Sequence, residues 1–329
     1  MADSVLTRDN PQLSGPKNLS PVFEVAPFAI NCTPNADVQT YVEASVSGAT
    51  KTAYQSDLAK FIGWGGTIPC SDATLAAFIA NHAVSHAPAT LARWISSIAK
   101  AHRASGLPSP STSELVKATL RGIRRTHGTA QKQAKPLLRD DLFAILEVMG
   151  DCTKDRRDRA LLLLGFAGGF RRSELTGLDL TDIEFVRQGL IVHLRRSKTD
   201  QDGEGRKIGI PFGRGRWCPV TAVRQWLETA MLTDGPLFRL VDRHGTISSD
   251  RLSSEAVCLV LKSRLERAGI DPKGFSGHSL RAGFATSAAQ AGVSAQKIRQ
   301  QTGHTSDEML SRYIRDGELF LGNAAGVIL

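Results

Sequence analysis

The chain has 329 residues, of which 41% are hydrophobic, and this is enough apolar material for about two globular domains. No apolar run approaches the ~20 residues that a membrane-spanning helix needs, so we expect no membrane domain. Lysine and arginine number 41 against 32 acidic residues, and the formal charge of +9 favours a polyanionic partner.

The five cysteines are scattered along the chain, odd in number and free of any CxxC spacing. This pattern is typical of buried thiols in a reducing compartment rather than of a disulfide framework. The first residues are polar and include Asp3, Arg8 and Asp9, which does not fit a signal peptide. We therefore expect a soluble, cytoplasmic protein.

The N-terminal part of the sequence predicts an arm followed by a helical domain. Residues 1–37 are polar and rich in proline, which favours a mobile arm. Apolar residues then follow helical spacing in residues 50–64, 72–84 and 89–104. We assign residues 38–127 to an all-helical domain.

Basic residues gather on the later helices of this domain and beyond it. Between Lys117 and Arg139 the chain has seven basic residues and no acidic one. A solvated helix face followed by a tether would explain such a run, but its length favours a surface that follows DNA phosphates. The residues expected to contact DNA are Arg93, Lys100, Arg103, Lys117, Arg121, Arg124, Arg125, Lys132 and Lys135. Arg264, in the later part of the chain, is a further candidate.

Residues 128–138 lack apolar periodicity and form the predicted basic linker to a second domain, residues 139–329. This domain is expected to be mostly helical with a small sheet. Its expected helices lie near residues 139–150, 155–168, 219–231, 252–268, 279–291 and 294–301. Its expected strands are residues 182–186, 190–195 and 207–211, with the turn-rich segment SKTDQDGEG before the last of them.

The stretch from His278 to Tyr313 holds residue types that suit chemistry on a phosphodiester. It contains GHSLRAG and GHTSDEMLSRYIR, and so includes His278, Arg281, His304 and Tyr313. Arginine pairs with non-bridging phosphate oxygens, histidine transfers protons near neutral pH, and a tyrosine hydroxyl can be a covalent nucleophile. Each residue alone has a commoner explanation, such as a capping histidine or a core tyrosine. Their combination predicts a phosphate site.

Two upstream segments can add to this site. GFRRSELTGL, which begins at Gly169, places Arg171 and Glu174 three residues apart on one helix face. The simpler explanation of that pair is an intrahelical ion pair. Lys198 lies at an expected strand end beside the Gly-rich hairpin, where an isolated lysine would be a surface residue. A lysine on a hairpin can also protonate an alkoxide leaving group.

Together, the segments GFRRSEL, RSKTDQ, HSLR, GH and the tyrosine resemble the active-site set of the tyrosine recombinases, the phage integrase family. Upstream, AHRASGLPSPS, GIRR and the linker are similar to the core-binding domain of Cre-type members. The resemblance covers about residues 45–329. It implies a mainly α fold, with an all-helical, SAM-like core-binding domain. A mixed, mostly helical catalytic domain with a small antiparallel β-sheet would follow.

The resemblance also implies roles at the reacting phosphate. Tyr313 would attack the scissile phosphate and form a 3′-phosphotyrosyl bond, leaving a free 5′-hydroxyl. Arg171, Arg281 and His304 would hold the non-bridging oxygens and stabilise the transition state. The position of His304 varies within the family, since Cre-type enzymes carry tryptophan there and many integrases carry histidine.

Three further residues would serve this reaction according to the same resemblance. Lys198 would protonate the leaving 5′-oxygen, and His278 would take the tyrosine proton. Glu174 would support Arg171 or His278 from behind. These side chains suffice for the chemistry, so no metal, cofactor or ATP is expected. His82 and His86 have the spacing of an HExxH pair, but no glutamate follows His82, which argues against zinc.

The implied activity is site-specific recombination through a Holliday junction. A monomer in solution would assemble as a homotetramer on two inverted-repeat sites in double-stranded DNA, in the cytoplasm and on the nucleoid. The apolar segment at residues 317–329 favours docking on a neighbouring subunit over packing on its own domain. The alternatives are an enzyme that relaxes DNA of any sequence, like a type IB topoisomerase, and a DNA-binding regulator that kept the fold without activity.

Overall fold

The computed structural model describes residues 36–129, 133–195, 205–304, 310, 311 and 313. The chain divides into two compact units, Met1–Gln131 and Lys132–Leu329. Most of the expected N-terminal arm lies outside the described residues, as do Lys132, Lys198 and the segment at 317–329.

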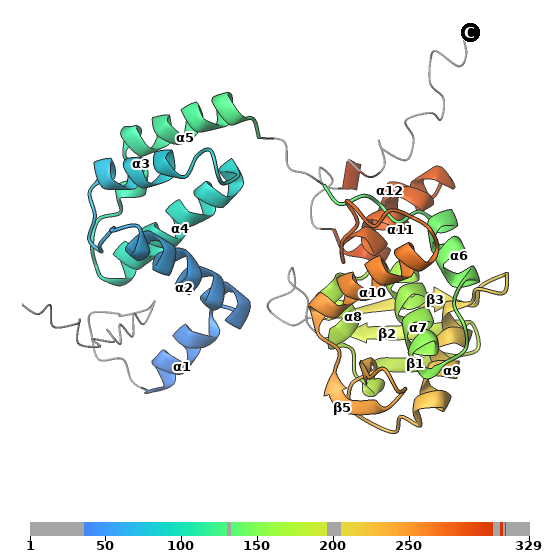
Figure 1. The fold of residues 1–329 in the computed structure, drawn as a ribbon. Helices are drawn as coiled ribbons and strands as arrows, with labels where there is room; N and C mark the ends of the chain where they lie inside the picture. The colour runs from blue at the N-terminus through green and yellow to red at the C-terminus, as the bar shows by residue number, and fades with distance from the viewer. Residues whose placement is uncertain (1–35, 130–132, 196–204, 305–309, 312, 314–329) are drawn as a thin grey trace, which may run out of the picture. The chain divides into compact units, whose positions relative to one another are not determined.

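The N-terminal unit is helical, as predicted (Figure 1). Its elements are α1 (Ala36–Ala44), α2 (Gly48–Gly63), α3 (Asp72–Asn81), α4 (Pro88–Ala104), the short 3-10 helix η1 (Pro110–Thr112) and α5 (Glu114–His127). Ser47, Ser71 and Ser113 begin α2, α3 and α5, and each side chain accepts a backbone N–H of the first turn. The buried core between these helices contains Phe61, Leu75, Phe78, Ile79, Leu91, Trp94, Ile95, Ile98, Val116 and Ile123.

The C-terminal unit combines helices with two small antiparallel sheets (Figure 1). Its helices are α6 (Arg139–Glu147), α7 (Thr153–Ala167), α8 (Arg172–Gly177), η2 (Leu180–Asp182), α9 (Pro219–Ala230), α10 (Ser254–Arg267), α11 (Ser279–Gln290) and α12 (Ala295–Thr302). Its strands are β1 (Ile183–Val186), β2 (Gly189–Leu194), β3 (Arg206–Pro211), β4 (Arg239–Val241) and β5 (Ile247–Arg251).

The sheet β1–β2–β3 is the one that the sequence predicts. β2 is the central strand and pairs antiparallel with both neighbours. Along β3 the burial alternates, so that Ile208 and Ile210 enter the core while Lys207 faces solvent. Arg206, at the start of β3, has the same parity as the two isoleucines and therefore lies on the inner face.

The second sheet, β4–β5, is absent from the sequence-based expectation. β4 has only three residues, and β5 reads ISSDR, which lacks the apolar alternation of a half-buried strand. The turn between them is held by Asp242, whose Oδ1 accepts from the backbone N–H groups of His244 and Thr246 at 2.8 and 2.9 Å. Turn chemistry rather than apolar pattern therefore specifies this hairpin.

Helix α7 lies in the middle of the core and packs against α9 and α11. Leu161, Leu162, Leu163 and Leu164 are all buried, so the helix has no exposed face over this stretch. The chain then turns sharply through Gly168 and Gly169 into α8. This turn brings Arg171 next to the start of α11 and the end of α12, because Arg281 donates to the carbonyls of both Gly169 and Thr302.

A buried ion cluster joins α7 to α10. Arg264 donates from Nε and Nη2 to Oδ2 of Asp158 at 2.9 and 2.6 Å, and its Nη1 lies 2.5 Å from Asp155. Arg157 binds the other carboxylate oxygen of Asp158. Arg264 is only 4% exposed. The expectation that Arg264 contacts DNA is therefore wrong, because its guanidinium is committed to the core.

Candidate active site

Six of the seven expected catalytic residues lie among the described residues, and they come from three parts of the C-terminal unit. Arg171 and Glu174 belong to the start of α8, and His278 and Arg281 to the start of α11. His304 follows α12, and Tyr313 comes nine residues later. Lys198 falls outside the described residues.

Arg171 and Glu174 form a close pair. Arg171 is the N-cap residue of α8, and its backbone N–H donates to Oε2 of Glu174 at 2.9 Å. Its Nη1 donates to Oε1 of the same carboxylate at 2.5 Å. The Glu174 side chain is 3% exposed and that of Arg171 18%. The buried carboxylate therefore fixes the arginine while leaving part of it open to a ligand.

Arg281 is almost fully buried, at 1% exposure. Its Nη1 donates to the carbonyl of Gly169 at 2.7 Å and also to that of Thr302. Its Nη2 is buried and has no hydrogen-bond partner within the described part of the chain. Burial and the positive charge of Arg171 lower the pKa of Arg281 to about 10, so it stays charged at neutral pH. A buried cation with a free donor is a strong attractor for an anion.

His278 and Tyr313 are in direct contact. Nε2 of His278 lies 3.1 Å from the phenol oxygen of Tyr313. His278 is exposed by its solvent-accessible surface, but the protein around the imidazole partly desolvates it. This desolvation, together with the charges of Arg281 and Arg171, lowers the pKa of His278 from its ordinary value. The imidazole is therefore neutral at neutral pH and can accept the phenol proton.

His304 is buried, at 4% exposure, with its ring centroid 5.8 Å from that of Tyr313. The hydroxyl of Thr302 donates to the carbonyl of Ile298 at 2.7 Å and lies 2.7 Å from Nδ1 of His304. Since the only hydroxyl hydrogen is used, Nδ1 must carry the proton and donate to Thr302. Nε2 of His304 has no hydrogen-bond partner among the described residues.

The pKa of His304 is lowered to about 3 by burial and by the neighbouring charges of Arg281 and Arg171. Neutral His304 therefore has an unprotonated Nε2. That atom can donate to a phosphate oxygen only after it gains a proton, which the negative charge of a phosphate would favour.

Arg206 also lies at this site, although the sequence-based reasoning did not select it. Its Nη2 is 3.6 Å from Oε2 of Glu174, and its Nη1 donates to the carbonyl of Gln301 at 3.3 Å. Lys207 stands beside it in the sequence and is equally basic. Only the alternation along β3 shows which of the two points inward. The sequence signal that could have indicated Arg206 is a basic residue at the start of this strand.

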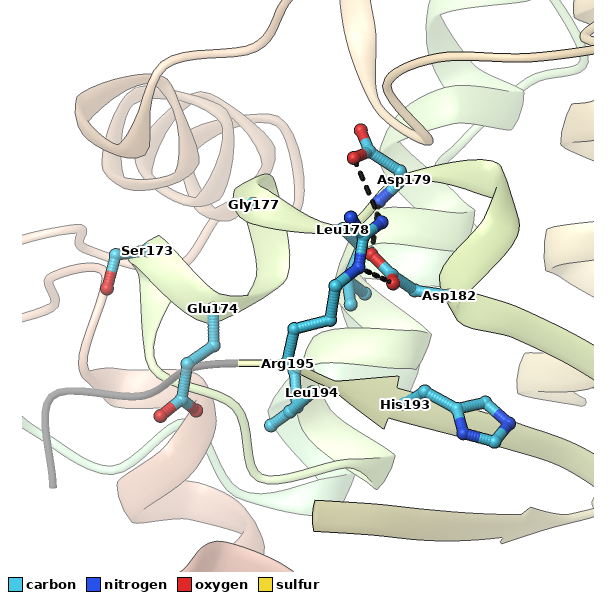
Figure 2. Close-up of a pocket in the computed structure, with 9 residues that line it drawn as sticks. All are labelled: Ser173, Glu174, Gly177, Leu178, Asp179, Asp182, His193, Leu194 and Arg195. Atoms are coloured by element: carbon cyan, nitrogen blue, oxygen red, sulfur yellow. Dashed lines mark hydrogen bonds and ion pairs between the residues drawn. The ribbon is translucent and has the colours of Figure 1, made fainter. Parts of the chain in front are cut away.

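A cavity of about 310 Å³ adjoins the site through Glu174 and is lined by residues of α8, of the segment after it and of the end of β2. Figure 2 shows Ser173 and Glu174 at one side of its lining and His193 at the other, with Arg195 between them and its guanidinium reaching toward Asp179 and Asp182. Arg195 lies 2.5 Å from Asp182 and 3.2 Å from Asp179. These pairs fasten the end of β2, from which the segment with Lys198 leaves.

The expected DNA contacts of the N-terminal unit fall into two groups. On α5, Lys117, Arg124 and Arg125 are exposed, while Arg121 is paired with Glu114 on the surface. On α4, Arg93 donates to the buried carboxylate of Asp57 at 2.8 Å, which gives it a structural role as well.

The remaining expected contacts are partly engaged in packing. Lys100 lies over the ring of Tyr54 at 4.9 Å, and Arg103 is exposed at the end of α4. Lys135 lies over the ring of Phe275 at 5.9 Å. Lys132 is outside the described residues. Among the residues that the structure describes, no group of three potential metal ligands occurs. Within the same residues, no helix is long and apolar enough to cross a membrane.

Comparison with known proteins decides the family. Residues 135–318 match the model of the phage integrase family. The chain belongs to the phage integrase family. It is 38% identical to an integrase/recombinase XerD homolog of Selenomonas ruminantium, over 86% of both chains. It is 29% identical to the recombinase Cre of Escherichia phage P1, over 69% of this chain and 70% of Cre.

Solved structures of the family share the fold. A XerH site-specific recombinase bound to palindromic difH substrate matches with a TM-score of 0.62 at 17% identity, covering 84% of this chain and 79% of that one. A lambda integrase dimer bound to a COC′ core site matches with a TM-score of 0.59 at 19% identity, covering 85% of this chain and 76% of that one. The expected fold is confirmed, and the chain is an enzyme of the tyrosine recombinase type.

Proposed function

We propose that this recombinase cuts and rejoins DNA at a specific target through a phosphotyrosine bond at Tyr313. The observation that carries the proposal is the contact of the Tyr313 phenol with a neutral His278, at 3.1 Å, beside a cluster of arginines. Free tyrosine has a pKa of ~10 and is a poor nucleophile at neutral pH without such a base.

The first step is a transesterification. The phenol oxygen of Tyr313 attacks the scissile phosphorus while its proton moves to Nε2 of His278. The bond from phosphorus to the 5′-oxygen breaks, and Lys198 supplies the proton that makes a 5′-hydroxyl. The DNA keeps a 3′-phosphotyrosyl end. Reversal with a 5′-hydroxyl from another strand rejoins DNA, and no ATP is needed because the ester bond is conserved.

The arginines stabilise the charge that develops on the non-bridging oxygens. Arg171 is held by Glu174, and Arg281 is held by the carbonyls of Gly169 and Thr302. Because these supports are rigid and buried, little reorganisation is needed during the reaction. His304, once protonated at Nε2, would add a further donor to the same oxygens.

Binding to DNA would use the basic face of α5 and the linker. Lys117, Arg124 and Arg125 are exposed on this helix, within a run free of acidic residues. Such contacts neutralise phosphates and position the protein without reading sequence. We place the enzyme in the cytoplasm, on the nucleoid when bound to DNA.

We also propose that the active assembly is a homotetramer on two inverted-repeat sites, formed from monomers and passing through a Holliday junction. A lambda integrase tetramer bound to a Holliday junction has the same fold, with a TM-score of 0.58 at 18% identity. The segment at 317–329 would dock on the neighbouring subunit. Removing it and finding unchanged assembly on DNA would exclude that docking.

The proposed function can be tested before the target sequence is known. Tagged protein is incubated with sheared genomic DNA from its source, denatured and captured, and the DNA that stays attached is sequenced. We expect covalently attached DNA to be enriched for one inverted-repeat sequence, and to be absent with Tyr313→Phe. Adducts spread over all sequences would indicate a relaxing enzyme, and no adduct would indicate a regulator without activity.

A further inference from the structure

We propose that Arg206 is a third arginine contact of the scissile phosphate, donating from Nη2 beside Arg171 and Arg281. The inference rests on the proposed function, because it assigns another contact to the same phosphate. The family resemblance read from the sequence gave Arg206 no role.

The location of Arg206 is fixed from two sides. It is the first residue of β3, and its side chain lies on the same, inner face of the sheet as those of Ile208 and Ile210. Its Nη1 donates to the carbonyl of Gln301 near the end of α12, at 3.3 Å. The guanidinium lies directly on Gly303, where a Cβ would overlap it. Arg206 is thus held next to His304, in the same way that Arg281 is held by backbone carbonyls.

The second nitrogen of the guanidinium is unused. Nη2 is buried and has no hydrogen-bond partner among the residues that the structure describes. Its ion-pair partner there, Oε2 of Glu174, is 3.6 Å away and already accepts the backbone N–H of Arg171 at 2.9 Å. An unsatisfied buried donor is costly, and a phosphate oxygen would satisfy it. The Arg206 side chain as a whole is 23% exposed, so part of it borders solvent beside the buried Nη2.

The charges around Arg206 favour the same ligand. Among the described residues, Glu174 is the carboxylate that interacts with all three of Arg171, Arg206 and Arg281. Burial and the charge of Arg171 lower the pKa of Arg206, although Glu174 partly offsets this. Arg206 in turn lowers the pKa values of Arg281 and His304. A phosphate placed among these groups would relieve their mutual repulsion.

Arg206 could instead act only through Glu174, by holding the carboxylate that orients Arg171. The two explanations differ in their dependence on Glu174. A direct phosphate contact should matter even when the carboxylate is removed, whereas a support for Glu174 should become irrelevant. A double-mutant cycle with Glu174→Gln therefore separates them.

The experiment measures single-turnover formation of the covalent complex at saturating DNA. The probe is a nicked duplex of the sequence recovered by genomic capture. The variant is Arg206→Gln, and the matched control is Lys207→Gln, which removes the same charge from the outer face of the same strand. Circular dichroism and thermal unfolding check that both variants are folded.

We expect Arg206→Gln to slow cleavage roughly 100-fold, as the loss of one preorganised donor does, in both the wild-type and the Glu174→Gln background. Lys207→Gln should stay close to wild type. Equal cleavage rates for Arg206→Gln and Lys207→Gln would overturn the proposal. A defect of Arg206→Gln that vanishes in the Glu174→Gln background would overturn it as well, because Arg206 would then act only through the carboxylate.

A second readout is independent of recombination. Inorganic phosphate at constant ionic strength should raise the unfolding temperature of wild type and Lys207→Gln, and raise that of Arg206→Gln clearly less. The same shift in both variants would overturn the phosphate contact. If genomic capture yields no adduct, this measurement still decides whether Arg206 binds an anion, so its failure is distinguishable from that of the proposed function.

Discussion

The phenol oxygen of Tyr313 lies 3.1 Å from Nε2 of His278, across 35 positions of sequence. The imidazole is held at the start of α11, and partial desolvation together with Arg281 and Arg171 lowers its pKa. This relationship assigns base and nucleophile to two named residues.

The first prediction concerns the pH dependence of cleavage. In the enzyme without DNA, the pKa of His278 is lowered from its ordinary value of 6.5. Its imidazole is therefore neutral at neutral pH and becomes protonated only below pH 6.5. We expect cleavage at subsaturating DNA to fall as pH drops below that value. His278→Gln should lower the rate by roughly 100-fold or more and remove this acid limb. Measured rates that keep the acid limb in His278→Gln would contradict the assignment.

The second prediction concerns stability. The pKa of His304 is lowered from 6.5 to about 3, so the unfolded chain binds a proton that the folded chain does not in this window. The stabilisation is complete above 6.5 and declines as pH falls toward 3. His304→Gln should flatten the decline in the free energy of unfolding. The control is His193→Gln, which replaces a half-exposed histidine on β2 and so removes no buried imidazole. Equal slopes in both variants would argue against a buried neutral His304.

The third prediction uses two glycines. Gly303 and Gly292 both have positive φ, at 66° and 75°, so alanine strains either position by about 1 kcal/mol. Only at Gly303 would the added Cβ overlap Arg206; around Gly292 nothing lies within 4 Å. We expect Gly303→Ala to lose more stability than Gly292→Ala in chemical denaturation, because of this overlap, and only Gly303→Ala to lose cleavage activity. Comparable cleavage activity of Gly303→Ala and Gly292→Ala would show that cleavage does not require the Arg206 guanidinium to pack against Gly303.

The fourth prediction concerns DNA binding by α5. Neutralising Lys117, Arg124 and Arg125 together should weaken binding and reduce the log–log salt slope by up to ~0.9 per lost phosphate contact. Glu114→Gln should act in the opposite direction, since it frees Arg121 from its ion pair. Titrations over a range of salt concentrations measure both effects. An unchanged slope in the triple variant would place the DNA on another surface.

Much of the C-terminal unit was predictable because its signals are local. β3 follows apolar alternation, β2 is a short apolar run, and the helix expected near residues 279–291 matches α11. The residue types around His278 and Tyr313 suggest phosphate chemistry from the sequence alone. Their hydrogen bond does not follow from spacing, since it depends on how the chain returns after α12.

The other features of the site depend on tertiary context. Arg206 and Lys207 look alike in sequence, and only the register of β3 turns one inward. Arg264 has the sequence context of a surface cation, but α7 places Asp155 and Asp158 against it. The tautomer of His304 depends on a threonine hydroxyl already bonded to Ile298. The partners of Arg206 and Arg264 come from other elements and leave no local signature. The contacts of His304 are local, but its tautomer follows only from the hydrogen-bond geometry of Thr302.

The most direct test of the central claim is mass spectrometry of the covalent complex formed on captured DNA. After nuclease and protease digestion, we expect a nucleotide joined to the peptide that contains Tyr313, through a phosphodiester at its 3′ end. Attachment to Tyr41, Tyr54 or any other side chain, or an adduct that persists in Tyr313→Phe, would contradict the account.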